Sequence, residues 1–114
     1  GHLISGHVVG MADILSIEKA TNNYRITFTG DDTWMKFVFE KGYLAVNGCS
    51  LTVAEMDRKL KQFSINLIPE TLKRTNLELL QRGDKVNIEV EAQTQAIVET
   101  VERVLNERFP LEKN

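Results

Sequence analysis

Short segments in which apolar and polar residues alternate dominate this chain. In the segment 24–29 every second residue is apolar, a period of two that gives a strand one buried and one exposed face. Segments with this period, or with a high apolar content between turn signals, predict six strands, at 5–17, 24–29, 43–46, 49–56, 63–68 and 86–90. Gly6 and Gly10 lie inside the first strand and predict a kink or bulge there.

Turn residues separate these strands. Asn47-Gly48 between two apolar runs predicts a tight hairpin, because both residue types tolerate a positive φ angle. A short helix is expected after Thr33, which would cap it, and Gly42 would follow its last turn. A further helical turn is expected at 69–71.

One long helix is predicted at 93–108. Ile97, Val101, Val104 and Leu105 recur at helical spacing and form an apolar stripe along it. A second apolar row leaves two arrangements open. Either both rows pack on the rest of the domain, or one of them packs on a partner.

Six strands with tight turns and two short helices predict a mainly β domain, built as an antiparallel barrel or sandwich. Closure into a barrel would remove the open strand edges that a small antiparallel sheet otherwise exposes. The length of 114 residues, without an internal repeat or linker, predicts one domain.

Composition and charge exclude several classes of function. The chain has 14 basic and 16 acidic residues and a net charge of −2, which argues against a nucleic-acid partner. It has no apolar run of about 18 residues, so no membrane span is expected. Cys49 is the single cysteine, which excludes an internal disulfide and fits a reducing, cytoplasmic setting. Because the chain begins at Gly1, we expect it to be processed or excised from a longer one.

Uncharged polar residues suggest a ligand site. Ser50 and Thr52 are two residues apart on a predicted strand and would present two hydroxyls on one face. The helical turn that opens at Glu70-Thr71 would leave free backbone N–H donors. Such groups suit a neutral, hydroxyl-rich heteroaromatic ligand better than an anion. The alternative is that the two hydroxyls simply face solvent.

The other reactive residues have plainer interpretations. His7 is typical of a surface or hydrogen-bonded histidine, and His2 would not share a strand face with it, so no metal site is expected. Cys49 is more typical of a small buried residue than of a nucleophile. Lys41 beside Gly42 is typical of a cation at a helix end.

An ordered set of strings resembles riboflavin synthase. They are GHLISGHV at 1–8, KG at 41–42, NGCSLTV at 47–53, LIPETLKRTNL at 67–77, GDKVNIEV at 83–90, QTQ at 93–95 and VERVL at 101–105. Each string alone is weak evidence, but the set follows the family's order and spacing from Gly1 to about Arg108. The opening string and the terminal helix resemble the second half of the family's two-barrel chain.

The resemblance implies a six-stranded antiparallel Greek-key barrel with short helices at 1–92, and a C-terminal oligomerisation helix and tail at 93–114. It also implies partners: the N-terminal barrel of a family chain, a homotrimer in the full-length protein, or a homodimer of the single domain. In the family, the site lies between the first half of one subunit and the second half of another.

The resemblance further implies an enzyme, a transferase that binds 6,7-dimethyl-8-ribityllumazine. Two molecules dismutate, and one donates a four-carbon unit to the other, which gives riboflavin and 5-amino-6-ribitylamino-pyrimidinedione. The family uses no metal or organic cofactor. An isolated half should bind ligand yet turn over poorly, unless two copies face each other.

Carried over by position, the resemblance implies three catalytic residues, His7, Ser50 and Thr52. The residues implied to bind substrate are Gly6, His7, Val8, Lys41, Ser50, Leu51, Thr52, Asn66, Leu67, Ile68, Pro69, Glu70 and Thr71. One position departs from the family pattern, since Asn47 stands where second halves often carry Asp.

A second hypothesis is a lumazine or flavin carrier of the same superfamily, which would hold the ligand without turnover. His7, Ser50 and Thr52 favour the enzyme. A nucleic-acid-binding barrel is the weakest alternative, because the sequence lacks a basic groove and aromatic stacking platforms.

Overall fold

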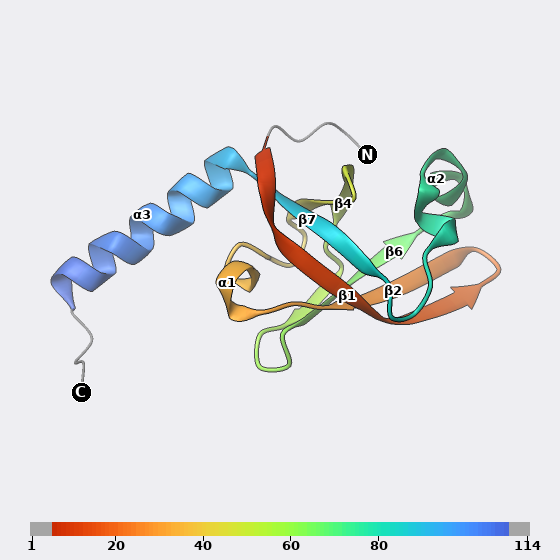
Figure 1. Ribbon diagram of the computed structural model, residues 1–114, viewed down its shortest axis with the longest axis horizontal. Helices are drawn as coiled ribbons and strands as arrows, with labels where there is room; N and C mark the ends of the chain where they lie inside the picture. The colour runs from red at the N-terminus through yellow and green to blue at the C-terminus, as the bar shows by residue number, and fades with distance from the viewer. Residues whose placement is uncertain (1–5, 110–114) are drawn as a thin grey trace.

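A single curled antiparallel sheet forms the body of the domain in the computed structural model, which describes residues 6–109 and the side chains from Val8 onward (Figure 1). The hydrogen-bonded order of its seven strands is β4-β3-β7-β1-β2-β6-β5. The strands are β1 (Gly6–Ala20), β2 (Asn23–Thr29), β3 (Tyr43–Val46), β4 (Cys49–Thr52), β5 (Glu55–Asp57), β6 (Gln62–Leu67) and β7 (Lys85–Glu91). The helical segments are α1 (Asp32–Met35), α2 (Pro69–Arg74), the 3₁₀ turn η1 (Asn76–Leu79) and α3 (Ala92–Arg108). The predicted mainly β fold is confirmed.

The predicted strand 49–56 is wrong in one respect, because it divides into β4 and β5. Val53 still pairs with the segment before β3, through its N–H to the Gly42 carbonyl at 2.9 Å. The next residue, Ala54, donates its N–H to the Ser64 carbonyl of β6 at 2.8 Å. The chain thus changes its pairing partner between Val53 and Ala54. The two end strands of the sheet are consecutive in the chain, so this step closes the barrel and accounts for seven strands where six were predicted.

The connection from β2 to β3 gives the barrel its Greek-key path. β3, β4, β5 and β6 follow one another along the chain, and β6 returns to lie beside β2 over its full length. β7 then fills the place between β1 and β3. Such a path makes neighbours of strands that are far apart in sequence.

β1 is longer than predicted and carries two irregularities. It runs to Ala20 rather than residue 17. The register shifts between Val8 and Gly10 against β7, which confirms the bulge expected near Gly10, and again between Ile14 and Ser16 against β2. Bulges increase the local bend of a strand, so β1 can pair with both neighbours while the sheet curls.

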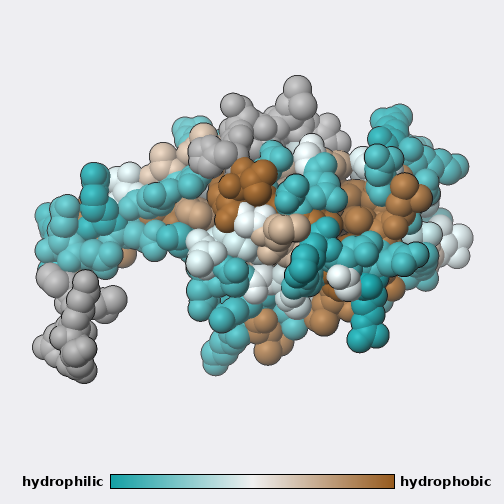
Figure 2. All heavy atoms as spheres, viewed as in Figure 1, coloured by the Kyte–Doolittle hydropathy of each residue, from teal (hydrophilic) through white to brown (hydrophobic). Residues whose placement is uncertain are grey.

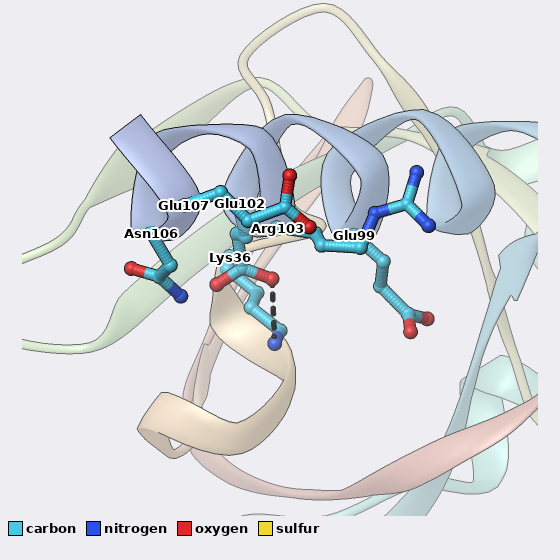
Figure 3. A pocket seen from close by; sticks show the side chains of 6 residues that line it. All are labelled: Lys36, Glu99, Glu102, Arg103, Asn106 and Glu107. Carbon is cyan, nitrogen blue, oxygen red and sulfur yellow. Dashed lines mark hydrogen bonds and ion pairs between the residues drawn. The ribbon is translucent and has the colours of Figure 1, made fainter. Parts of the chain in front are cut away.

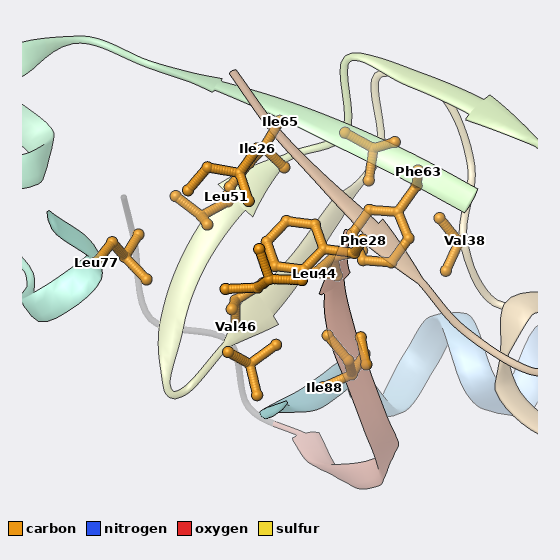
Figure 4. Packing of buried hydrophobic residues seen from close by; sticks show 14 of the residues in the cluster. Ile26, Phe28, Val38, Leu44, Val46, Leu51, Phe63, Ile65, Leu77 and Ile88 are labelled. Atoms are coloured by element: carbon orange, nitrogen blue, oxygen red, sulfur yellow. The ribbon is translucent and has the colours of Figure 1, made fainter. Parts of the chain in front are cut away.

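Stacked aromatic rings lie among aliphatic side chains in the centre of the barrel (Figure 4). The rings of Phe28 and Phe63 stack with centroids 4.9 Å apart, and Trp34 meets Phe63 edge-on at 6.0 Å. Leu72 and Leu77 bring the α2–η1 segment into the same cluster. The barrel interior is therefore closed by α1 and by α2–η1.

Trp34 fits against backbone that carries no side chain. A Cβ atom on Gly10 would lie 2.3 Å from the Trp34 Cδ1, and one on Gly30 would lie 2.4 Å from its Cη2. Both distances are well below van der Waals contact. These two glycines are required by the indole ring and not by an unusual φ angle.

The expected cap and exit of the first helix are both corrected. Asp31, not Thr33, is the N-cap, and its carboxylate accepts the Thr33 N–H at 2.8 Å as well as the Thr33 hydroxyl. The helix ends at Met35, and Lys41 rather than Gly42 takes the left-handed conformation, with φ of 64°. The hydrogen bonds from Thr33 lower the pKa of Asp31 below its usual value.

α3 confirms the long helix predicted at 93–108, and it extends away from the barrel (Figure 1). None of its described side chains is buried, although Val98 packs against the core. Most of the predicted stripe is half exposed, with Ile97 at 56% and Val101 at 52%. On the face drawn in Figure 2, hydrophilic side chains cover most of the helix and apolar ones are visible between them. Within residues 6–109, the helices fall short of the length and apolar content that a membrane span requires.

Replacing Gly30 by Ala should destabilise the domain by about 1–3 kcal/mol, because the new methyl group overlaps the Trp34 ring. Urea unfolding followed by circular dichroism measures this. The same change in a Trp34→Phe background should cost less, since Phe lacks the two ring atoms nearest to Gly30 and the Met35 Sδ, at 2.9 Å, belongs to a flexible side chain. An equal cost in both backgrounds would contradict the proposed clash.

Replacing Asp31 by Ala should lower the free energy of unfolding at neutral pH by about 1 kcal/mol, through loss of the helix cap. The folded-state pKa of Asp31 lies below the usual value of an aspartate, so its contribution is present above that usual value and is lost as the pH falls through the folded pKa. The difference between the two proteins should therefore shrink in acid. Asp31→Asn, a neutral cap, serves as control and should show no such titration.

Candidate functional site

A row of residues across four strands joins two of the predicted site segments. Val8 of β1 pairs with Glu89 of β7, Glu89 pairs with Ala45 of β3, and Ala45 pairs with Ser50 of β4. Residues directly opposite in neighbouring strands share a face of the sheet. The structure thus places Val8 and Ser50 in one register row on the outer face.

Ser50 and Thr52 lie on the same face, as the sequence predicts. Leu51 between them belongs to the core, so its neighbours face outward. Thr52 is exposed, whereas Ser50 is only 5% exposed and its Oγ has no hydrogen-bond partner among the described residues. A buried hydroxyl without a partner is uncommon and is free to bond to a ligand or a water molecule.

The backbone of β4 also has polar groups to offer. In an antiparallel pair, hydrogen-bonded residues alternate with residues whose N–H and C=O point the other way. Val53 bonds to Gly42, so Leu51 and Cys49 also bond toward β3. The backbone groups of Ser50 and Thr52 therefore point to the opposite edge, where β4 has no partner strand within residues 6–109.

The end of β6 presents a matching edge. The Ser64 carbonyl accepts the Ala54 N–H, so the backbone of Asn66, two residues further, faces the same side. β5 pairs only with residues 62–64 of β6 and does not reach Asn66. We call these two edges, Ser50–Thr52 of β4 and Asn66 of β6, the open seam. Leu51 and Leu67 belong to the core beneath it, and Leu77 in η1 belongs to the same cluster (Figure 4).

The segment after β6 extends the seam. Ile68, Pro69 and Glu70 are exposed, and Thr71 is half-buried. The expectation of several free N–H donors here is corrected, because the Thr71 and Leu72 N–H groups both bond to the Ile68 carbonyl. Pro69 has no N–H, so the turn offers a ligand at most the N–H of Glu70.

Lys41 lies where the two edges of the seam meet. Its backbone N–H donates to the Val53 carbonyl at 2.8 Å, one residue beyond Thr52. The side chain is exposed. The structure therefore brings Lys41, Ser50, Thr52 and Asn66 to one region of the barrel surface.

The first predicted segment is described only in part. The backbone of Gly6 pairs with Glu91 and that of His7 with Val90, which places both at the start of β1 beside the end of β7. The side chain of His7, and the whole of His2, lie outside the described part of the chain. The role assigned to His7 remains a prediction.

Glu89 is a polar residue of this region that the sequence did not single out. It is half-buried in the row between Val8 and Ala45. The alternation in β7 does place Glu89 on the outer face, but only the pairing of β7 with both β1 and β3 brings it between the two predicted segments. The local pattern carries no information on that pairing.

Cys49 behaves as the sequence predicts. It is half-buried and packs against the core, and this burial raises the pKa of its thiol above the usual value. A protonated thiol is a poor nucleophile at neutral pH. Within residues 6–109, no group of three or more His, Cys, Asp or Glu side chains is placed to hold a metal ion.

Surface hollows occur away from the open seam. One of about 520 Å³ lies between Lys36 and the polar face of α3, where the Lys36 Nζ is 2.9 Å from the Glu102 Oε1 (Figure 3). Another of about 340 Å³ lies over Thr27 and Ser64 on the outer face of β2 and β6. Of the predicted site residues, Val8 lines a third hollow of about 240 Å³.

Comparison with known proteins gives consistent matches. The riboflavin synthase of Escherichia coli (strain K12) is 46% identical over 109 residues, which are 95% of this chain and 50% of that protein. The riboflavin synthase of Chlamydia pneumoniae is 45% identical over 105 residues, 92% of this chain and 50% of that protein. The chain thus spans about half the length of the curated relatives it matches.

Solved structures share the fold. LumP complexed with riboflavin matches with a TM-score of 0.68 and 28% identity, over 75% of this chain and 45% of that one. LumP complexed with 6,7-dimethyl-8-(1'-D-ribityl) lumazine matches with a TM-score of 0.68 and 20% identity, over 74% of this chain and 46% of that one. The family model described as the lumazine binding domain matches residues 5–91. The chain therefore belongs to the lumazine-binding domain family.

Proposed function

We propose that this domain is the lumazine-binding second half of a riboflavin synthase. The observation that carries the proposal is the open seam of a lumazine-binding domain. Together with Lys41, where its two edges meet, the seam brings Ser50, Thr52 and Asn66 together from distant parts of the sequence. The relatives with 46% and 45% identity are riboflavin synthases, and the fold neighbours were solved with riboflavin and with a ribityl lumazine.

The seam suits the ligand's heterocycle. The edge of a pyrimidinedione alternates hydrogen-bond donors and acceptors, as an unpaired strand edge does. The backbone groups of Ser50 and Thr52 would meet one part of the ligand, and Asn66 and the Glu70 N–H another. Hydroxyl side chains can both donate and accept, which suits the ribityl chain. Apart from Lys41 and Glu70, the site offers uncharged groups to an uncharged ring system.

The chemistry requires proton transfer and the precise placement of two rings. The 7-methyl protons of the lumazine are acidic because the heterocycle delocalises the carbanion. An imidazole can take up and release protons, so His7 would move them, while Ser50 and Thr52 would hold an adding hydroxyl or a water. One lumazine gives up a four-carbon unit and the other receives it, which leaves riboflavin and the ribitylamino-pyrimidinedione. Holding two rings at reacting distance supplies much of the acceleration.

The site would be completed by another domain. The chain spans half of its relatives, and we place the first barrel of a neighbouring subunit across the seam. Residues 1–92 would form the binding barrel, and the helix and tail at 93–114 would join subunits in a homotrimer, or single domains in a homodimer. The half-exposed stripe of Ile97, Val101 and Leu105 supports this role. With one half-buried cysteine, the cytoplasm is the proposed location.

A second candidate is a domain that binds the lumazine without converting it. The fold neighbours named LumP were solved in complex with lumazine, riboflavin and flavin mononucleotide, so this fold holds such ligands in a stable complex. Fold alone does not separate binding from turnover.

Mixing the purified chain with 6,7-dimethyl-8-ribityllumazine should quench or shift the lumazine fluorescence in a saturable way. Riboflavin should form slowly with the chain alone and faster when a first-half domain is added, because the second ring then has a site. Binding without riboflavin under both conditions would favour the carrier. The absence of any fluorescence change would overturn the proposal.

Replacing Ser50 by Ala should weaken lumazine binding about threefold to tenfold, the effect of one lost hydrogen bond. The same change should leave the free energy of unfolding nearly unaltered, because the Ser50 Oγ has no protein partner to lose among the described residues. Fluorescence titration and urea unfolding measure the two effects.

Ser64→Ala is the matched control. Ser64 is also buried, its Oγ also lacks a partner within residues 6–109, and its side chain lines the hollow over β2 and β6. Lumazine affinity should be unchanged in this variant. If both variants bind equally well, Ser50 does not contact the ligand.

A further inference from the structure

Lys41 has a backbone conformation that its side chain does not favour. Its φ angle is 64°, in the left-handed region, where a residue with a Cβ atom is disfavoured. Asn47 and Lys61 share this conformation, with φ of 49° and 56°, and both lie in turns, Asn47 beside Gly48 and Lys61 after β5. A lysine does not favour this conformation, so it is held by the turn that the Gly42 N–H and the Phe39 carbonyl close and by the contacts of that turn.

The residues that flank Lys41 are bonded on both sides. The Lys41 N–H donates to the Val53 carbonyl at 2.8 Å, and the Gly42 N–H donates to the Phe39 carbonyl at 3.0 Å. Glu40 Oε1 accepts the Met56 N–H of β5 at 3.4 Å. These contacts fix where the segment leaves the barrel, but not the path by which it reaches Lys41 from α1.

Arg58 fixes that path. Its Nη1 donates to the Met35 carbonyl at 3.1 Å and its Nη2 to the Val38 carbonyl at 2.9 Å. The guanidinium also lies over the Phe39 ring, 5.5 Å from the centroid. One side chain from the turn after β5 thus contacts Met35, Val38 and Phe39, all in the segment that leads from α1 to Lys41.

We propose that Arg58 is a positioning residue, which holds the 35–39 segment so that Lys41 keeps its left-handed backbone at the apex of the open seam. The inference rests on the proposed lumazine site, because the purpose of this arrangement is to aim the Lys41 side chain at the ligand. Lys cannot replace Arg here, since only the planar guanidinium reaches two carbonyls and stacks on a ring at once.

Arg58→Lys should weaken lumazine binding about tenfold. Without the two carbonyl bonds and the contact with Phe39, the turn at 39–42 would be held less firmly, and fewer chains would have Lys41 at positive φ. The measured affinity falls with the fraction of chains that are competent to bind. Lys59→Ala is the control, because it removes a neighbouring exposed cation without touching the 35–39 segment. It should bind as the unaltered chain does.

Combining the substitution with Lys41→Gly separates positioning from general stability. Glycine adopts positive φ without help, so Arg58→Lys should change the affinity less than twofold in a Lys41→Gly background. An equal loss in both backgrounds, or no loss in the native background, would overturn the proposal. Circular dichroism establishes that each variant is folded.

A second readout does not depend on the ligand. Three-bond NMR couplings report the φ angle of residue 41 in the free chain, which should move from positive toward negative φ in Arg58→Lys and stay positive in Lys59→Ala. An unchanged φ in Arg58→Lys would overturn the inference even if lumazine binds. If the φ angle moves but the native chain binds no lumazine, the proposed function fails and the link between Arg58 and Lys41 stands.

Discussion

The step between Val53 and Ala54 is the constraint on which the rest of this domain depends. Two successive residues bond to different neighbours, Val53 to Gly42 and Ala54 to Ser64, so one stretch of chain joins the two ends of the sheet. Closure encloses the apolar core without a long unpaired edge. Within residues 6–109, β4 and β6 form no strand ladder with each other beyond this point, so the open seam begins at the same step that closes the barrel.

Packing at the core explains why the ends of the barrel are rigid enough to carry a site. Trp34 lies against Gly10 and Gly30, and its ring meets Phe63, so α1 cannot shift without opening the core. On the other side, Leu77 anchors the turn that follows β6. The residues of the seam are exposed or polar, but each lies within a few residues along the chain of a buried core residue such as Leu51 or Leu67. Such support places binding groups accurately on a small scaffold.

Charge has a minor part in this region. The net charge is −2, and the described residues of the seam contribute Lys41 and Glu70 besides uncharged groups. Recognition at the proposed site would then depend mainly on hydrogen-bond direction, which backbone edges and hydroxyls define well. α3 has little contact with its own barrel, and its apolar stripe is half exposed. Both features fit a chain that spans about half the length of its relatives.

The sequence by itself determined the local features: the alternating strands, the Asn47-Gly48 turn with both φ angles positive, and α3 within one residue of its predicted start. It also carried the strings that identify the family. Only the tertiary structure decided the break between β4 and β5, the left-handed Lys41, the row that brings Glu89 between Val8 and Ala45, and the contacts of Arg58. Periodicity and turn preference are properties of neighbouring residues, whereas pairing partners and burial are set by segments far apart in the chain.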